Sequence, residues 1–458
     1  MAARRLVVVG GDAAGMSAAS QARRLQEQDE LEIVAFERGS FTSYSACGIP
    51  YWIGGDVAER DALVARTPQE HRERGIDLRL HTEVTELDLA GQRVRSRDAD
   101  GEEDWTGFDA LVLATGARPL RPPLPGIDAR GVHGVQSLED GTALLETLER
   151  QEHAGNGARR AVVLGAGYIG VEMAEALMRR GYGVTVLDRA AEPMTTLDPD
   201  MGALVRKAMR GMGIRVRTGE TVTGVLTDRE GRARAVETDA DEYPADLVVL
   251  GLGVRPETTL AARAGLPLGD SGGLLTDQSM RVREHHNVWA GGDCVEVLEL
   301  VSGRMRHIPL GTHANKHGRI IGANVAGGYG TFPGVVGTAV SKVCDLEIAR
   351  TGLLSEQADD VGFRYIATTV EATGRAGYLP GAEPMHVKML AEERTGRLLG
   401  VQIVGGEGAG KRVDIAAVAL TARMTVEQMT GLDLGYAPPF SPVWDPVLVA
   451  ARKAASRV

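Results

Sequence analysis

Two separate parts of the chain show the same order of hydrophobic and polar positions. In residues 5–15, RLVVVGGDAAG, an apolar run ends in glycines, and the helix-like stretch MSAASQARRLQEQ then leads to a second apolar run, LEIVAFE. Residues 160–170, RAVVLGAGYIG, are followed in the same way by VEMAEALMRR, the breaker Gly181 and GVTVLD. Short apolar runs that alternate with helix-period stretches predict strands and helices in turn. Each part is therefore predicted to form a βαβ unit.

The second unit carries a complete glycine fingerprint. Gly165, Gly167 and Gly170 form G-x-G-x-x-G between the strand and the helix. The first glycine makes a tight turn, the second lets the backbone approach a pyrophosphate, and the third lets the helix pack closely on the strand. Asp188, at the end of the next predicted strand, stands where a carboxylate accepts hydrogen bonds from a ribose. This order of elements predicts a dinucleotide site.

The first unit departs from the fingerprint at one position. Asp12 occupies the middle glycine position between Gly10 and Gly15. Glu37, at the end of LEIVAFE, supplies the ribose acceptor and restores the pattern. The predicted helix begins with unpaired N–H groups and the positive end of its dipole, which favour an anion such as a pyrophosphate. The chain is thus predicted to bind two dinucleotides.

Two further apolar runs end in glycine turns. DALVLATGARP, residues 109–119, ends in Thr115-Gly116, and NVWAGGDCVE, residues 287–296, contains a GGD turn in which Asp293 is well placed to bind a sugar hydroxyl. Because these runs bracket the second unit, they indicate a discontinuous first domain interrupted by an inserted one. The fold class is predicted to be α/β.

Composition narrows the class of partner and the compartment. The net charge of −11 argues against a nucleic-acid partner, because neutralising phosphates takes a surplus of Lys and Arg. The N-terminal apolar run is too short for a signal peptide or a membrane span, which predicts a cytoplasmic protein with no membrane partner. Cys47, Cys294 and Cys344 form no close pair and no metal-ligand spacing. Neither a disulfide scaffold nor a metal site is expected.

These motifs resemble those of the pyridine nucleotide-disulfide oxidoreductases, and the resemblance covers nearly the whole chain. It implies two Rossmann-like dinucleotide-binding domains, one for FAD and one for NAD(P)H, and a C-terminal α+β dimerisation domain that makes a homodimer. The implied FAD-binding domain is residues 1–118 and 250–327, the NAD(P)H-binding domain is residues 119–249, and the dimerisation domain is residues 331–458.

The same resemblance assigns the cofactor residues. Those implied for FAD are Gly10, Gly15, Glu37, Arg38, Thr115, Gly116, Asp293 and, at the start of a helix facing the flavin, Thr312 and Ala314. Those implied for the nicotinamide cofactor are Gly165, Gly167, Tyr168, Ile169, Gly170 and Asp188. Tyr168 resembles the residue that covers the flavin until nicotinamide displaces it. Asp188 favours NADH because a carboxylate repels a 2′-phosphate, whereas Arg189 attracts one, so NADH with some use of NADPH is expected.

A lone cysteine in residues 43–52, SYSACGIPYW, indicates the branch of the family. Trp52 stands where members with a redox-active pair have a second cysteine, and the chain lacks a His-Pro-Thr segment near its C-terminus. It therefore resembles the single-cysteine branch of coenzyme A-disulfide reductases, NADH oxidases and NADH peroxidases. Oxidases and peroxidases carry a histidine where this chain has Ala13, and its absence favours thiol exchange over peroxide chemistry.

One stretch resembles the helix with which coenzyme A-disulfide reductases bind the nucleotide end of coenzyme A. It is SQARRL, residues 20–25, in which Gln21 and Arg24 lie three apart on one helical face. With Ser43, these are the implied coenzyme A residues. A solvated helix face is the structural alternative for this pair.

Two tyrosines match those that coenzyme A-disulfide reductases bring to the partner subunit's cysteine. Tyr378 lies in RAGYLPGAEP and Tyr436 in LGYAPPFSPVWDP. Ala46 stands where some members have Asn, and Leu379 where many have a second Tyr. These departures leave the preferred disulfide open.

Cys47 must be a thiolate to act as a nucleophile, so its pKa is expected to lie below the free value of about 8.5. Gly48-Ile49-Pro50 predicts a helix start whose N–H groups stabilise the anion. In the expected cycle, NAD(P)H reduces the flavin, the flavin reduces a mixed disulfide of Cys47 with coenzyme A, and the thiolate then attacks a new disulfide. Tyr436, with Tyr378 nearby, is expected to assist the departing sulfur. Cys294 and Cys344 are expected to be small core residues.

Three alternative functions remain open. An NADH oxidase would reduce oxygen with Cys47 cycling through a sulfenic acid, and a persulfide or polysulfide reductase would use another sulfur acceptor. A flavoprotein that only binds a partner or signals has no need for a nucleophile at position 47.

Overall fold

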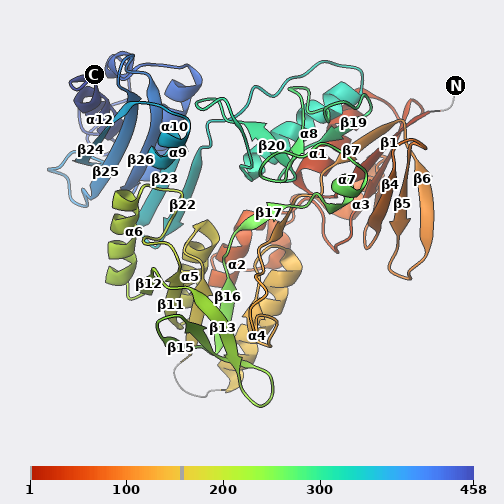
Figure 1. Ribbon diagram of the computed structural model, residues 1–458, viewed down its shortest axis with the longest axis horizontal. Coiled ribbons are helices and arrows are strands. Elements are labelled where there is room, and N and C mark those ends of the chain that lie inside the picture. The colour runs from red at the N-terminus through yellow and green to blue at the C-terminus, as the bar shows by residue number, and fades with distance from the viewer. Residues whose placement is uncertain (1–2, 155–158) are drawn as a thin grey trace.

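The computed structural model describes residues 3–154 and 159–458. Figure 1 shows three α/β units, of which the first combines red and orange N-terminal segments with green and teal segments from much later in the chain. The second unit is yellow to green and the third is blue. Residues 1–2 of the predicted FAD-binding domain and residues 155–158 of the predicted NAD(P)H-binding domain lie outside the described residues.

A parallel sheet forms the centre of the first unit. Its five strands have the order β19-β7-β1-β2-β3, and each neighbouring pair runs parallel. Val7 and Val8 are completely buried, as expected for a parallel sheet covered on both faces. Because β19 pairs with β7, the chain returns to this sheet after building the second unit. The strands are β1 (Arg4–Val9), β2 (Leu31–Phe36), β3 (Asp77–Arg79), β7 (Ala110–Leu113) and β19 (Val288–Ala290).

Two helices of this unit, α1 (Ala13–Leu25) and α8 (Gly311–Val325), pack closely against each other. A Cβ added at Gly318 would lie 2.3 Å from the Ala14 carbonyl oxygen, and one at Gly322 would lie 2.4 Å from the Ala18 carbonyl oxygen. Glycine is therefore required at both positions. Ala14 meets Gly318 and Ala18 meets Gly322, so the two helices run in the same direction. The starts of α1 and α8 therefore lie at the same end of the pair.

Shorter elements surround this sheet. After β2 come η1 (Ala46–Gly48), α2 (Ile49–Gly54), η2 (Arg60–Leu63) and α3 (Pro68–Glu73). An antiparallel sheet is formed by β4 (Glu83–Asp88), β5 (Arg93–Arg97) and β6 (Glu103–Gly107). The later segment adds α7 (Thr259–Arg263), β18 (Leu274–Leu275), β20 (Val295–Leu298) and β21 (Met305–Arg306).

The second unit repeats the parallel arrangement. Its sheet has the order β12-β11-β10-β16-β9, and all neighbours are parallel. The strands are β9 (Val132–His133), β10 (Arg160–Leu164), β11 (Gly183–Asp188), β12 (Arg215–Thr218) and β16 (Leu247–Leu250). The helices are α4 (Leu138–Ala154), α5 (Tyr168–Arg179) and α6 (Pro199–Gly211), and β13 (Val222–Thr227), β14 (Ala233–Thr238) and β15 (Glu242–Pro244) form an antiparallel sheet. At the two crossings to the first unit, β8 (Ala117–Pro119) pairs with β17 (Val254–Pro256).

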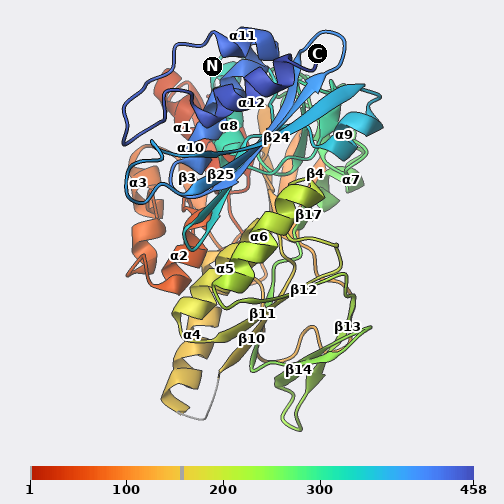
Figure 2. The same ribbon diagram turned by 90° about the vertical axis from the view of Figure 1, so that its left-hand side faces the viewer.

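The third unit has an antiparallel sheet of five strands in the order β22-β23-β26-β25-β24. The strands are β22 (Ala339–Val343), β23 (Leu346–Gly352), β24 (Tyr365–Thr373), β25 (Pro384–Glu392) and β26 (Leu398–Gly405). The helices are α9 (Ser355–Asp360), α10 (Ala409–Thr421), α11 (Val426–Thr430) and α12 (Pro446–Ala455). Helices α5 and α6 of the second unit lie next to this sheet (Figures 1 and 2). Across residues 3–154 and 159–458, no helix is both long and apolar enough to cross a membrane.

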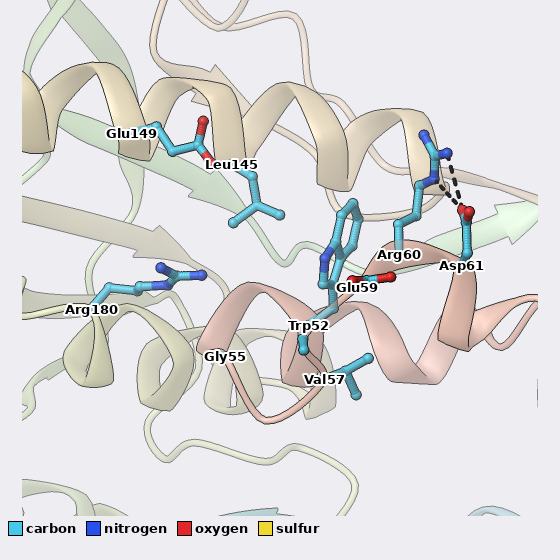
Figure 3. Close-up of a pocket in the computed structure, with 10 residues that line it drawn as sticks. Trp52, Gly55, Val57, Glu59, Arg60, Asp61, Leu145, Glu149 and Arg180 are labelled. Carbon is cyan, nitrogen blue, oxygen red and sulfur yellow. Dashed lines mark hydrogen bonds and ion pairs between the residues drawn. The ribbon is translucent and has the colours of Figure 1, made fainter.

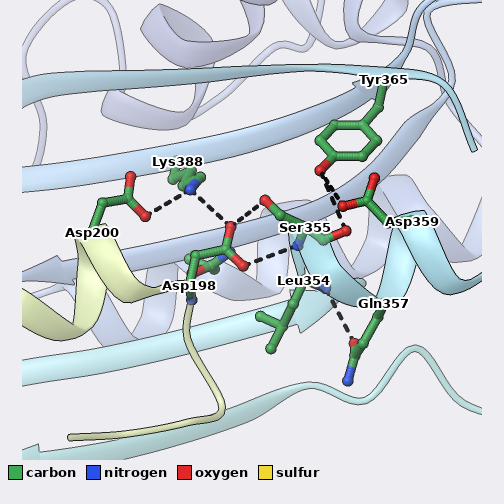
Figure 4. Close-up of polar contacts among 9 residues, drawn as sticks. Asp198, Asp200, Leu354, Ser355, Gln357, Asp359, Tyr365 and Lys388 are labelled. Atoms are coloured by element: carbon green, nitrogen blue, oxygen red, sulfur yellow. Dashed lines mark hydrogen bonds and ion pairs between the residues drawn. The ribbon is translucent and has the colours of Figure 1, made fainter. Parts of the chain in front are cut away.

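A buried ion-pair network joins the second and third units (Figure 4). The Lys388 ammonium, on β25, lies 2.8 Å from an Asp198 carboxylate oxygen and 2.7 Å from one of Asp200. Asp198 also accepts hydrogen bonds from the N–H and the hydroxyl of Ser355, at 2.9 and 2.6 Å. Because Asp198 immediately precedes α6, this network holds the start of α6 against the C-terminal sheet.

Candidate active site

The loop between β1 and α1 is closed by Glu37 at the end of β2. Glu37 accepts hydrogen bonds from the N–H of Gly11, at 2.8 Å, and from the N–H of Gly39, at 2.7 Å. Gly10 has a φ of +107°, and a Cβ there would lie 2.1 Å from the Ala114 carbonyl oxygen. Only glycine fits this turn. The turn brings the N-terminus of α1 to the carboxyl edge of the parallel sheet, where a dinucleotide pyrophosphate can bind.

The loop between β10 and α5 has the same construction. Asp188, at the end of β11, accepts hydrogen bonds from the N–H of Ala166, at 2.6 Å, and of Ala190, at 2.8 Å. A Cβ at Gly170 would lie 1.9 Å from a backbone oxygen, so glycine is needed for α5 to approach the strand. At Gly167 an added Cβ would meet open space, which leaves room for a ligand beside the backbone. Tyr168 and Ile169 begin α5 directly after this opening.

The remaining residues predicted to bind FAD lie at the carboxyl edge of the first sheet. Gly116, with open space around its Cα and a φ of +69°, follows β7. Asp293 follows β19, and burial raises the pKa of its carboxyl while His307 lowers it. Arg38 is exposed. Exposed Thr312 and buried Ala314 lie in the first turn of α8. The Thr115 hydroxyl donates a hydrogen bond to the Glu257 carbonyl at 2.5 Å.

The hydrogen-bonding groups at this edge of the sheet and the open space beside them fit a bound FAD. The first loop offers a helix N-terminus for a pyrophosphate and the Glu37 carboxylate for a ribose. Open space lies beside Gly116, and the start of α8 lies beside the start of α1. A dinucleotide laid along this edge would meet each of these groups in turn.

Cys47 is exposed and lies in η1, directly before α2. The predicted helix start at Gly48-Ile49-Pro50 is confirmed, since α2 begins at Ile49 with Pro50 in its first turn. Cys294 is fully buried, as predicted. Cys344 is half-buried and packs against the core of the second unit, but it lies in the turn between β22 and β23, with a φ of +50°, and not in a strand as predicted. The run VSKVCDLEI reads as one strand in the sequence, but it forms a hairpin.

The segment that leads to Cys47 is tied to the first dinucleotide loop. The Thr42 hydroxyl donates a hydrogen bond to the Gly11 carbonyl at 2.5 Å, and the Tyr44 N–H donates to the Asp12 carboxylate at 3.2 Å. Asp12 is therefore not a defect of the glycine fingerprint. Its side chain joins the loop to the segment that carries Cys47. The sequence analysis did not predict this role, and the only sign of it in the sequence is an Asp at a position where the fingerprint has Gly.

The surroundings of Cys47 raise the pKa of its thiol. Although part of the residue is exposed, the protein around the sulfur displaces water, and this burial is the largest cause. The negative charges of Glu172 and Asp293 raise the pKa of Cys47 further, and only its own backbone hydrogen bond acts in the opposite direction. The backbone contribution at the helix start does act in the predicted direction, but in the single chain burial and the two carboxylates outweigh it, so the net shift of this pKa is opposite to the expected one.

Comparison with known proteins identifies the family. Residues 4–318 match the family model described as pyridine nucleotide-disulphide oxidoreductase, and residues 338–446 match the dimerisation domain of the same family. The chain belongs to the pyridine nucleotide-disulphide oxidoreductases. The predicted family, the fold class with its C-terminal dimerisation domain, and the class of NAD(P)H-dependent flavoprotein are confirmed.

Relatives of this oxidoreductase chain carry several functional names. It is 38% identical over 456 residues to the NAD(P)H sulfur oxidoreductase (CoA-dependent) of Pyrococcus furiosus, covering 99% of each chain. It is 36% identical to an NADH oxidase of Methanocaldococcus jannaschii, again over 99% of each chain. A solved NAD-dependent persulfide reductase from A. fulgidus superposes with a TM-score of 0.94 at 38% identity, over 99% of this chain and 83% of that chain.

The predicted coenzyme A residues of the oxidoreductase lie on and beside α1. Gln21 is half-buried and Arg24 is exposed. Arg66, which sequence reasoning missed, extends a nitrogen to 3.4 Å from the Ser20 hydroxyl and so adds a second cation beside the same helix. Its distance in sequence from α1 concealed this contact.

Ser43 is joined to a buried histidine. Its hydroxyl lies 2.9 Å from Nε2 of His71, which is completely buried. Burial and, to a smaller extent, the nearby Arg66 and Arg74 lower the pKa of His71 to about 4, so His71 is neutral at pH 7. His71 thereby fixes Ser43, whose φ of +50° is uncommon for a residue with a side chain.

The two predicted tyrosines of the oxidoreductase project from neighbouring loops of the third unit. Tyr378 is 76% exposed and Tyr436 is 53% exposed, so neither is packed within its own chain. Buried Arg412 holds both loops, because its Nη2 donates to the Gly374 carbonyl at 2.6 Å and to the Phe440 carbonyl at 2.7 Å. The structure therefore brings the two tyrosine loops together, and among the described residues neither tyrosine makes a hydrogen bond with Cys47 of the same chain.

A cavity of about 550 Å³ lies near α2 but apart from the predicted site (Figure 3). One part of its rim is fixed by Arg180, whose Nε donates to the Ile53 carbonyl at 2.7 Å. It holds no thiol and none of the predicted site residues, so we place the candidate active site at Cys47. The lining residues are Trp52, Gly55, Val57, Ala58, Glu59, Arg60, Asp61, Leu145, Glu149 and Arg180.

Proposed function

We propose that the protein is a FAD-dependent NAD(P)H oxidoreductase that reduces a disulfide or persulfide of coenzyme A through Cys47. The observation that carries this proposal is a free, exposed Cys47 at the end of a segment bonded to the first dinucleotide loop. Since Cys294 is buried and Cys344 lies in a turn of another unit, Cys47 has to form its mixed disulfide with a substrate sulfur. The relatives named as a CoA-dependent sulfur oxidoreductase and a persulfide reductase support a sulfur acceptor.

In this proposal Glu37 holds the ribose of FAD and Asp188 holds that of the nicotinamide cofactor, because both carboxylates stand at a fingerprint loop. When bound, FAD would supply two-electron redox chemistry between NAD(P)H and the sulfur. Tyr168, at the opening between the loop and α5, covers the flavin until the nicotinamide arrives.

The nucleophilic step belongs to Cys47. Its thiolate attacks one substrate sulfur, the sulfur–sulfur bond of the substrate breaks, and a bond forms between Cys47 and the retained sulfur. The departing thiolate takes up one proton. Two electrons and a second proton then release the bound thiol and restore Cys47.

The site beside α1 fits coenzyme A by charge. Arg24 and Arg66 offer cations for phosphate oxygens, and Gln21 offers an amide on the same helical face as Arg24. Ser43, held by His71, lies between this face and Cys47 in the chain and is proposed to contact the pantetheine arm.

The protein is proposed to act as a homodimer in the cytoplasm. A match to the dimerisation domain of the family and the exposure of Tyr378 and Tyr436 support a site completed across the dimer. Tyr436 of the partner subunit would then donate a hydrogen bond to the substrate sulfur that is expelled when Cys47 attacks the disulfide.

The test compares acceptors with the purified holoenzyme. Coenzyme A disulfide, coenzyme A persulfide and oxygen are supplied in turn with NADH, and the protein mass is measured after exposure to the disulfide. We expect turnover with a coenzyme A acceptor, a mass increase of one coenzyme A on the wild type, and neither result with Cys47→Ser. Oxygen turnover far above sulfur turnover would instead support the oxidase function named for the Methanocaldococcus jannaschii relative. Full biological effect of the Cys47→Ser variant would support a signalling role.

A further inference from the structure

The turn that follows β19, residues 291–293, lies between the starts of two helices. Gly292 has a φ of +82°, and a Cβ there would lie 3.0 Å from the Ala14 Cβ, in the first turn of α1. The same Cβ would lie 3.8 Å from the Ala314 Cβ, in the first turn of α8. The turn therefore carries Asp293 to the edge of the sheet at which both helices begin.

His317 is the side chain of α8 that lies against this turn. It is completely buried, and its Nδ1 accepts a hydrogen bond from the Gly292 N–H at 3.2 Å. A Cβ added at Gly291 would lie 2.9 Å from the His317 Cβ, so the helix and the turn are in close contact. The Phe332 ring packs against the imidazole with centroids 4.3 Å apart and planes at 89°. Since Nε2 makes no hydrogen bond among the described residues, the bond to Gly292 is the one polar contact of this ring there.

The His317 ring is neutral, as this bond requires. Burial and, to a smaller extent, His313 and Lys316 lower the pKa of His317 to about 3. A neutral imidazole has one acceptor nitrogen, so the bond at Nδ1 leaves the proton on Nε2. Leucine would fill a buried apolar space without leaving an N–H unpaired. Packing alone therefore does not require a histidine at this position.

A second histidine holds the other side of Asp293. His307, directly after β21, donates its Nε2–H to the Asp293 carbonyl at 2.8 Å. Together the two histidines fix the backbone before and after the Asp293 Cα. Across residues 3–154 and 159–458, no hydrogen bond reaches the Asp293 carboxylate, which leaves its oxygens available to a ligand.

We propose that His317 and His307 are positioning residues that hold Asp293 in the orientation in which its carboxylate accepts a sugar hydroxyl of FAD. His317 acts through the Gly292 N–H and His307 through the Asp293 carbonyl, and neither ring is assigned a contact with FAD. A turn that is fixed before binding lowers the entropy cost of ordering it. This inference rests on the proposed function for the binding of FAD at Asp293, and it is independent of the acceptor that Cys47 reduces.

The experiment compares two substitutions of similar volume, His317→Asn and His317→Leu. The Asn side-chain oxygen lies near the place of Nδ1 and can accept the Gly292 N–H, whereas Leu cannot. Each holoenzyme is diluted in series, and the flavin fluorescence of released FAD gives the dissociation constant. We expect His317→Leu to raise this constant about three- to tenfold, the value of one lost hydrogen bond, and His317→Asn to stay within about twofold of the wild type.

A second pair of variants tests the other bond in the same way. His307→Leu removes the donor to the Asp293 carbonyl and should raise the dissociation constant of FAD by a similar factor. His307→Gln places an amide N–H near the position of Nε2 and should restore the wild-type value. This pair decides the question if His317→Leu yields no folded holoenzyme.

A double-mutant cycle separates positioning from a general structural effect. If His317 acts through Asp293, His317→Leu should raise the dissociation constant of FAD in the wild type and leave it unchanged in an Asp293→Ala background. An equal factor in both backgrounds, or Leu variants that bind FAD like the wild type while Asp293→Ala binds it weakly, would overturn this inference alone. An Asp293→Ala variant that binds FAD like the wild type would overturn both this inference and the proposed role of Asp293.

Discussion

Glu37 and Asp188 make equivalent hydrogen bonds in the two nucleotide units. Each carboxylate accepts the N–H of the residue that follows the first glycine of its loop, and each also accepts the N–H of the residue two positions after itself. A carboxylate has about four lone-pair sites, so two remain for ribose hydroxyls. The two units thus hold an equivalent carboxylate acceptor at the same point of each loop.

Substitution of Asp188 should change the choice of nicotinamide cofactor. Asp188→Ser removes the carboxylate that repels a 2′-phosphate while Arg189 remains beside it. We expect kcat/KM for NADH to fall about tenfold or more, the value of a lost hydrogen bond to a charged group, and the NADPH to NADH ratio to rise. Steady-state kinetics with both cofactors measure this. The control is Glu37→Gln, which should weaken retention of FAD and leave the cofactor ratio unchanged.

Asp12 should destabilise the folded protein at neutral pH. Burial is the main reason that the pKa of Asp12 is raised from 3.8 to about 6, so the folded state binds this proton more tightly than the unfolded state. The resulting stability is complete below pH 3.8 and is lost as the pH rises through about 6. Asp12→Asn should therefore gain about 1 to 3 kcal/mol in unfolding free energy at pH 7 and almost nothing near pH 4. Chemical denaturation of the apoprotein at both pH values measures the gain.

The matched control for this prediction is Asp12→Ala. Asparagine can still accept the Tyr44 N–H through its amide oxygen, whereas alanine cannot. If the Asp12→Ala and Asp12→Asn variants had the same unfolding free energy, the hydrogen bond to Tyr44 would contribute nothing to stability. A variant Asp12→Asn that is less stable than the wild type at pH 7 would contradict the prediction.

Loss of Lys388 should weaken the contact between the second and third units. Lys388→Met leaves the Asp198 carboxylate, which is 3% exposed, without its cation, and we expect a loss of about 3 to 5 kcal/mol. Burial raises the pKa of Asp198, but the hydrogen bonds from Lys388, Ser355 and Gln402 outweigh it and lower the pKa overall. The contribution of Asp198 is thus present above pH 3.8 and is lost as the pH falls below its folded pKa.

The pH dependence on the basic side has the opposite sign. Burial lowers the pKa of Lys388, but the hydrogen bonds to Asp198 and Asp200 raise it above 10.5 overall. Its contribution is present below pH 10.5 and is lost above its folded pKa. Thermal unfolding of wild type and Lys388→Met at pH 3, 7 and 11 should show the largest difference at pH 7. The double variant Asp198→Asn, Lys388→Met should recover part of the loss.

A mixture of two inactive variants should test the site across the dimer. Hybrid dimers of Cys47→Ser with Tyr436→Phe contain one site with intact Cys47 and an intact Tyr436 of the partner subunit. After unfolding and refolding together, about half of the dimers are hybrids, so about a quarter of the wild-type activity is expected. If Tyr436 served the cysteine of its own chain, the mixture would show no gain over the separate variants.

The local pattern of the sequence determined the two βαβ units, their glycine loops and the acids that close them. These features depend on residues within about 40 positions of one another. The period of the hydrophobic positions and the turn residues indicate secondary structure over such short stretches of sequence. The same local reading found Cys47, the start of α2 at Ile49 and the absence of a second cysteine at Trp52. Local reading failed at Cys344, because the run VSKVCDLEI has the period of a strand on both sides of a turn.

Only the tertiary structure decided the environment of the Cys47 sulfur. The pKa of Cys47 depends on burial and on Glu172 and Asp293, and both of these residues are distant from it in the chain. The bond of Asp12 to Tyr44 and that of Glu172 to Ser341 likewise join segments that carry no shared sequence pattern. Charge interactions and desolvation depend on distance in space, which the order of residues alone does not record.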